Sequence, residues 1–144
     1  MARLRAILEA RNPVVHLFDP DQTVAQAVAE MARYEIGVVP VVEKGRLVGI
    51  FSERDLVRRV MAAGRSLETT RVREVMTPNP VTASPDEDRQ SAMVKMQDLS
   101  CRHLPIVVDD AVIDMLSMRD LLFVELEARE QEIQALRGYI QGVY

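Results

Sequence analysis

The sequence repeats itself once: Pro105 matches Pro40 and Ser117 matches Ser52, an offset of 65 positions that holds without a gap. An internal repeat of this length is typical of two copies of one structural unit that pack together. Neither half of a 144-residue chain can bury a large core alone. We therefore expect the two copies to pack against each other about a pseudo-twofold axis. Further matches are Pro20 with Pro85, Ala27 with Ala92, Met31 with Met96, Arg54 with Arg119, and Asp55 with Asp120.

Each copy predicts a strand, a helix, two strands and a second helix. Alternating turn residues and β-branched runs indicate the strands, and apolar residues at helical spacing indicate the helices. In the first copy the expected elements are an extended run at 14–17, a helix that starts at Asp19-Pro20-Asp21-Gln22, strands at 36–42 and 46–51, and a helix from 52 to about 63. In the second copy, Ser84-Pro85-Asp86-Glu87 has the pattern of a capping box and predicts the start of the corresponding helix.

The flanking segments complete the predicted organisation. Leu4, Ile7 and Leu8 predict a short N-terminal helix that ends at Asn12-Pro13, because the residue before a proline disfavours helical geometry. The predicted segments are an N-terminal helix at 1–12, repeat 1 at 13–64, a polar linker at 65–76, repeat 2 at 77–125, and a C-terminal helical extension at 126–144.

The C-terminal helix has an apolar seam. Leu126, Ile133 and Ile140 recur every seven residues, Leu136 and Val143 lie between them, and Arg129 interrupts the series. Two interpretations stay open: the helix packs on its own domain, or it pairs with the same helix of a second copy as a short coiled coil.

A hydroxyl and a carboxylate recur at the predicted turn from strand to helix, as Ser52-x-x-Asp55 and Ser117-x-x-Asp120. The spacing fits a capping box, in which the two side chains only satisfy backbone groups. It also fits a ligand site, because a helix N-terminus faces anions with free N–H groups and a carboxylate offers acceptors for two ribose hydroxyls. Arg54 and Arg119 are either solvated or available to bind a phosphate.

Composition argues against several other functions. The chain has no Trp, three Tyr and three Phe, too few aromatic side chains for a stacking platform that binds single-stranded nucleic acid. One Cys and two His cannot form a Cys/His zinc site, and the lone Cys101 indicates a reducing compartment. No signal peptide, membrane-spanning stretch or catalytic motif is visible. We expect a cytoplasmic protein that is not an enzyme, holds no metal, and binds neither nucleic acid nor membrane.

These motifs resemble tandem CBS (cystathionine-β-synthase) domains, a pair of repeats also called a Bateman module. The resemblance rests on Gly49-Ile50-Phe51-Ser52-Glu53-Arg54-Asp55, on the pre-proline strands Ile36-Gly37-Val38-Val39-Pro40 and Cys101-Arg102-His103-Leu104-Pro105, and on Pro78-Asn79-Pro80-Val81-Thr82-Ala83-Ser84-Pro85-Asp86. It implies an α+β fold of two pseudo-twofold-related β-α-β-β-α repeats plus the C-terminal helix. Members of the family are regulatory modules that hold AMP, ADP, ATP, S-adenosylmethionine or NAD between the repeats, and they commonly form dimers.

The resemblance also implies which residues bind the ligand. Asp55 would accept the ribose hydroxyls with Ser52 near the phosphates, Gly37 and Val38 would contact adenine, and Arg102 with His103 would contact phosphates. The complete expected set is Ile36, Gly37, Val38, Ser52, Arg54, Asp55, Thr82, Arg102, His103, Ser117, Arg119 and Asp120.

The two expected clefts differ. Asp114 replaces Gly49, a position where a glycine would let backbone approach a ligand, and Asp110 replaces Gly45. Repeat 1 has Leu17 where repeat 2 has Thr82. We therefore expect the cleft with Asp55 to bind more tightly.

The functional hypothesis is a stand-alone sensor that requires no cofactor, binds an adenosine nucleotide as its regulatory ligand, forms a homodimer and acts on an effector protein that the sequence does not identify. The alternative is a ligand-free CBS pair that serves as a dimerisation scaffold.

Overall fold

The computed structural model describes residues 3–11 and 14–142 and confirms the β-α-β-β-α order of the first repeat. A short segment at Phe18 pairs in parallel with Val41. After it come helix α2 (Val24–Tyr34), strands β1 (Val38–Glu43) and β2 (Arg46–Ser52), and α3 (Glu53–Asp55), which continues as the π-helical segment η1 (Leu56–Met61). Strands β1 and β2 form an antiparallel hairpin.

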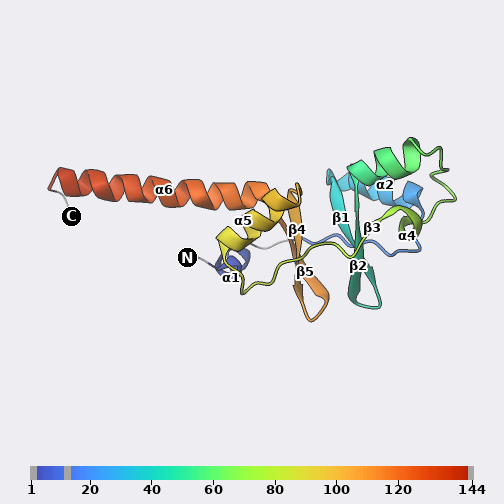
Figure 1. Cartoon of the computed structure of the whole chain (residues 1–144), viewed down its shortest axis with the longest axis horizontal. Coiled ribbons are helices and arrows are strands. Elements are labelled where there is room, and N and C mark those ends of the chain that lie inside the picture. The colour runs from blue at the N-terminus through green and yellow to red at the C-terminus, as the bar shows by residue number, and fades with distance from the viewer. Residues whose placement is uncertain (1–2, 12–13, 143–144) are drawn as a thin grey trace.

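The second repeat has the same order. Ala83 pairs in parallel with Ile106, as Phe18 does with Val41. The chain then forms α5 (Arg89–Asp98), the antiparallel hairpin of β4 (His103–Val108) and β5 (Ala111–Ser117), and α6 (Met118–Ile140). The two hairpins lie beside each other at the centre of the molecule, and α6 extends far beyond them (Figure 1). The predicted helix end at Asn12-Pro13 and the seam residue Val143 lie outside the described residues.

Both first helices of the repeats begin later than the sequence motifs predicted. Helix α2 has Thr23 as its N-cap, with a capping box formed by Gln26, and the segment from Asp19 forms a turn in which the Asp19 N–H donates to Gln22. Helix α5 is capped by Asp88, while Ser84 and Glu87 hold a turn before it. Asp19-Pro20 and Ser84-Pro85 therefore belong to turns that lead into the helices.

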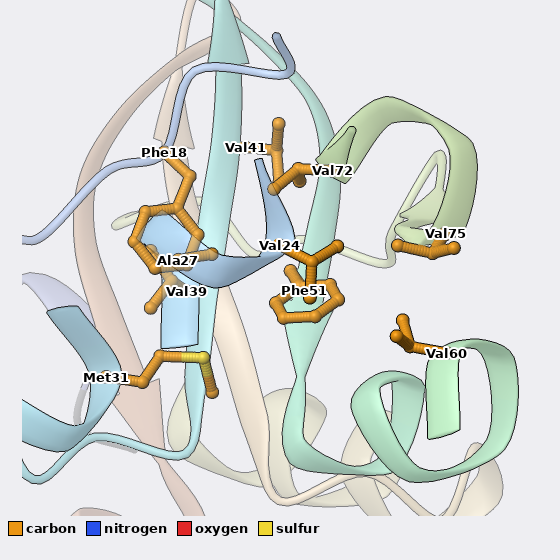
Figure 2. Packing of buried hydrophobic residues seen from close by; sticks show 10 residues of the cluster. All are labelled: Phe18, Val24, Ala27, Met31, Val39, Val41, Phe51, Val60, Val72 and Val75. Atoms are coloured by element: carbon orange, nitrogen blue, oxygen red, sulfur yellow. The ribbon is translucent and has the colours of Figure 1, made fainter. Parts of the chain in front are cut away.

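The core of the first repeat includes residues from the segment that the sequence predicted as a linker. Within it, α4 (Val72–Val75) places Val72 and Val75 in the first core, where both are buried. Figure 2 shows both side chains pointing into the cluster around Phe51. The buried members are Phe18, Val24, Ala27, Met31, Val39, Val41, Phe51, Val60, Val72 and Val75.

The N-terminal helix completes the other core. Helix α1 (Leu4–Glu9) precedes repeat 1 in the chain, yet Leu4 and Ile7 pack with the buried residues of repeat 2. The Leu4 N–H donates to the Glu87 carbonyl oxygen at 2.8 Å, as the Val72 N–H of α4 donates to Gln22 at 2.9 Å. Each repeat is thus completed by the helix that precedes the other repeat.

Position 49 lies so close to another segment of the chain that only a glycine fits there. Strand β3 (Thr77–Pro78) pairs with β2 so that Pro78 lies opposite Gly49. A Cβ atom at Gly49 would lie 2.6 Å from Met76 Sδ and 2.9 Å from the Thr77 carbonyl oxygen. The close neighbour of this glycine is therefore the segment from Met76 to Pro78, and packing within the chain is enough to require a glycine here.

We predict that Gly49→Ala lowers the free energy of unfolding by about 1–3 kcal/mol, the usual cost of forcing extra atoms into a packed site. Chemical denaturation measures the change. Gly37→Ala is the matched control, because the atoms nearest to its Cβ would be the carboxylate end of Glu53, an exposed side chain, at 3.2–3.3 Å. An equal, small effect of both substitutions would show that β3 does not need a glycine beneath it.

Candidate functional site

Two cavities lie between the repeats, one beside each turn from strand to helix. The first cleft, of about 320 Å³, has Ser52, Arg54 and Asp55 on one side and the segment from Leu99 to His103 on the other. The second cleft, of about 390 Å³, has Ser117 and Asp120 on one side and the segment from Glu35 to Val38 on the other. Each cleft therefore combines the Ser/Asp motif of one repeat with the strand entrance of the other.

In the first cleft, Ser52 and Asp55 form the capping box that their spacing predicted. The Asp55 carboxylate accepts hydrogen bonds from the Ser52 N–H at 3.0 Å and from Ser52 Oγ at 3.1 Å. The Asp55 N–H in turn donates to Ser52 Oγ at 3.2 Å. The first two bonds use the same carboxylate oxygen, Oδ2, and the three together fix the position of the side chain, which is buried.

The other oxygen of Asp55 is held by a residue that sequence reasoning missed. Thr77 Oγ1 donates to Asp55 Oδ1 at 3.0 Å, and the Arg59 guanidinium lies 3.6 Å from the same oxygen. Thr77 also lines the first cleft. The only sequence signal was its place before Pro78, which had indicated the end of the linker.

Two of the expected site residues lie elsewhere. Thr82 lines neither cavity of the described chain, and its carbonyl oxygen accepts a hydrogen bond from Lys95 Nζ at 2.9 Å. Arg119 is exposed on the first turn of α6 and also lines neither cavity. The offset of 65 matches Arg119 with Arg54 in the sequence, but only Arg54 lines a cleft.

The remaining expected residues line the clefts. Gly37, Val38 and His103 line both, Arg102 lines only the first, and Ile36 lines only the second. Burial lowers the pKa of His103, and the charge of Arg102 lowers it further, while Asp120 acts in the opposite direction. The imidazole is therefore favoured as a neutral group, able to donate one hydrogen bond and accept another.

Arg11 occupies the acidic side of the second cleft. Its Nη1 donates to Asp120 Oδ2 at 2.9 Å, and its Nη2 donates to Asp114 Oδ1 at 3.0 Å. Ser117 binds the same Oδ2 of Asp120 through its N–H at 3.0 Å and its hydroxyl at 2.8 Å. The sequence analysis considered Asp114 without a partner, so it missed this ion pair.

The two carboxyl groups beside Arg11 differ in their proton affinity. Burial raises the pKa of Asp114, against the opposing effects of the Met115 N–H and of Arg11. For Asp120, burial also acts to raise the pKa, but the bonds from Ser117 and the charge of Arg11 prevail and lower it. Of these two carboxyl groups, Asp120 therefore stays ionised more readily.

The charges that line the clefts favour phosphate in the first. Apart from histidine, Glu53, Asp55, Arg54 and Arg102 balance one another there. The second cleft has Glu35, Asp114 and Asp120 against Arg11 alone. Anions are repelled by excess negative charge, so a phosphorylated ligand meets less repulsion in the first cleft.

Residues 3–11 and 14–142 contain no group of three or more His, Cys, Asp or Glu side chains arranged to hold a metal ion. Within the same residues, no helix has both the length and the apolar character that crossing a membrane requires.

Comparison with known sequences identifies the repeated unit. The sequence model of the CBS domain matches residues 7–62 and again residues 72–127. A mitochondrial CBS domain-containing protein of Arabidopsis thaliana is 36% identical over 129 residues, and a CBS domain-containing protein of Bacillus subtilis is 30% identical over 118 residues. These alignments cover 86% and 82% of this chain. The chain spans 63% of the length of the Arabidopsis relative and 84% of the Bacillus relative.

Solved structures show the same fold. A CBS domain protein from Pyrobaculum aerophilum, complexed with AMP, has a TM-score of 0.72 and 24% identity, and the match covers 83% of this chain and 89% of that one. A CBS domain pair in complex with 5-methylthioadenosine and S-adenosyl-L-methionine has a TM-score of 0.75 and 22% identity, covering 88% and 98% of the two chains.

Proposed function

Because this chain belongs to the CBS domain family and its two copies pack as a pair, we propose that it is a regulatory module that binds an adenosine-containing ligand between them. The first cleft is the principal site in this proposal. The observation that carries it is the Asp55 carboxylate, which Ser52 and Thr77 hold at the edge of a cavity with balanced charge.

Each side of the first cleft has a role in the proposed complex. Asp55 accepts hydrogen bonds from the ribose hydroxyls, because a carboxylate offers only acceptors. Arg54 and Arg102 bind the phosphates, since guanidinium groups supply several donors and a positive charge. Gly37 and Val38 contact the adenine ring, for which a small and an apolar residue leave space. The cavity volume of about 320 Å³ lies within the range of small-molecule sites.

The ligands of related proteins support this choice of chemistry. The Pyrobaculum structure contains AMP, and the other CBS pair contains 5-methylthioadenosine and S-adenosyl-L-methionine. All three ligands share an adenosine core, the part that Asp55, Gly37 and Val38 would recognise. We propose AMP as the first ligand to test, because the charges of the first cleft suit a phosphate.

The second cleft binds more weakly in this proposal. Ser117 and Asp120 repeat the geometry of Ser52 and Asp55, and Ile36 with Val38 supplies an apolar surface. The excess of acidic side chains opposes phosphate there.

A ligand-free scaffold remains the alternative function. In both repeats the Ser/Asp pair satisfies backbone groups at a helix start, so the motif has a structural use without any ligand. The two functions differ in whether the first cleft binds a nucleotide at all. The protein regulated by the module, the absence of catalytic activity and a cytoplasmic location stay predictions.

We predict that AMP binds the intact protein and that Asp55→Ala weakens binding by about 1.5–3 kcal/mol, the range for hydrogen bonds to a charged group. Isothermal titration calorimetry measures the affinities. Asp55→Asn is the companion variant, because it retains an acceptor for the helix cap while removing the charge. Asp21→Ala, which removes an exposed carboxylate outside both clefts, is the control. Unchanged affinity in folded Asp55 variants would refute the assignment.

We also propose that the protein is a homodimer, because apolar side chains on two surfaces are left exposed by the part of the chain that the structure describes. On α6, Leu126, Ile133 and Leu136 are 68%, 49% and 62% exposed. On η1, Val57 and Met61 are 59% and 60% exposed. Apolar surface gathered in this way is typical of association sites.

Sedimentation velocity at micromolar concentration is predicted to show a species of twice the 16.2 kDa chain mass. Replacing Leu126 and Ile133 together by Ser distinguishes the two surfaces. A monomeric variant places the contact on α6, and a dimeric variant places it on the repeats. A wild-type protein that sediments only as a monomer would contradict the proposed dimer.

A further inference from the structure

Arg11 stands beside Asp114 as Met76 stands beside Gly49. The offset of 65 matches Arg11 with Met76 and Asp114 with Gly49 in the sequence. In repeat 1 the contact is apolar and so close that no Cβ fits at Gly49. In repeat 2 the same two positions form an ion pair at 3.0 Å. At these two positions, the repeats therefore differ in both residues of the contact: an apolar contact in repeat 1 and an ion pair in repeat 2.

The ion pair is held by burial. The Asp114 side chain is only 4% exposed, and its Oδ2 has no hydrogen-bond partner among the described residues. Removing the counter-charge of a buried carboxylate strongly destabilises the folded protein. Asp114 therefore keeps the Arg11 guanidinium in the cleft, where it is close enough to bind Asp120 as well.

Arg11 is the third donor to one oxygen of Asp120. Oδ2 accepts from the Ser117 N–H, the Ser117 hydroxyl and Arg11 Nη1. The corresponding oxygen of Asp55 accepts only from the N–H and the hydroxyl of Ser52. A carboxylate oxygen has about two lone-pair positions, which the Ser bonds use in both repeats. What distinguishes Asp120 is a charged third donor, the Arg11 guanidinium, at the same oxygen.

We propose that Arg11 is an internal competitor for the ligand of the second cleft: a nucleoside that hydrogen-bonds both oxygens of Asp120 must first displace the guanidinium. This inference rests on the proposed role of Asp120 as a ribose-binding carboxylate. Arg11 directly follows α1, and α1 closes the core of repeat 2. A ligand that displaces Arg11 from the second cleft would therefore disturb the packing of α1 against repeat 2. In the first cleft the guanidinium nearest the carboxylate, Arg59, lies 3.6 Å from Asp55 Oδ1, beyond hydrogen-bond distance, so it competes less with a ligand. The first cleft therefore fills at lower ligand concentration.

The test transfers the contact pair of repeat 1 into repeat 2. Arg11→Met and Asp114→Gly are combined in an Asp55→Ala background, which leaves the second cleft as the one under study. Uncharged adenosine is the probe, because its affinity does not depend on phosphate repulsion. Calorimetry is expected to show binding at least about tenfold tighter than in the Asp55→Ala parent, since a charged competing hydrogen bond is removed.

Two further variants define the effect. Arg11→Met alone leaves Asp114 buried without its counter-charge and is expected to lower the melting temperature, which Asp114→Gly restores. Arg5→Met is the matched control, because Arg5 also lies on the N-terminal segment but pairs with Asp86 at the surface. It is expected to leave adenosine affinity unchanged.

Unchanged adenosine affinity in the folded Arg11→Met/Asp114→Gly protein would overturn the proposal. If the chain with all its native residues binds neither AMP nor adenosine, the proposed function fails, and the pKa of Asp120 from carboxyl NMR decides the role of Arg11 separately. An Asp120 pKa that rises on removal of Arg11 shows that the guanidinium holds this carboxylate in solution. A pKa that stays the same shows that it does not.

Discussion

The exchange of helices between the repeats determines the rest of the structure. Helix α4 closes the core of repeat 1, and helix α1 closes the core of repeat 2, each through buried aliphatic side chains. Burying a Val or Leu side chain contributes about 1.5–3 kcal/mol, so neither repeat can dispense with the helix that precedes the other. The residues that follow each exchanged helix are consequently brought to the carboxylates of the clefts. Thr77 reaches Asp55 after α4, and Arg11 reaches Asp120 after α1.

The two clefts have the same Ser/Asp geometry but different third partners. A hydroxyl can donate to a carboxylate and still accept a hydrogen bond from a ligand, so Thr77 supports a polar ligand beside Asp55. A guanidinium only donates, so Arg11 occupies an acceptor that a ligand would use. Its charge also compensates Asp114, which otherwise would be buried as an unpaired ion. The difference between the clefts therefore lies in the segments that enter them, while the motifs themselves are conserved between the repeats.

The sequence predicted the features that depend on local patterns or on the repeat. The β-branched runs, the hairpins and the Ser/Asp boxes follow from spacing, and the structure has them where the offset of 65 placed them. The boundaries of α2 and α5 were wrong by about one turn, because Asp19-Pro20 and Ser84-Pro85 serve turns as readily as helix starts. Thr77 and Arg11 were missed because their partners lie 22 and 109 residues away, and no local pattern encodes such contacts. Thr82 was included by analogy of position, yet the structure places its carbonyl beside Lys95.

Whether the first cleft binds a nucleotide is the central claim, and chemical-shift mapping with AMP tests it most directly. In ¹⁵N-edited spectra, the account predicts that the amides of Gly37, Ser52, Asp55, Thr77 and Arg102 shift first as AMP is added. The amides of Ser117 and Asp120 should follow only at higher concentration. Shifts that begin at Ser117 and Asp120, or no shifts in either cleft at millimolar AMP, would contradict the account.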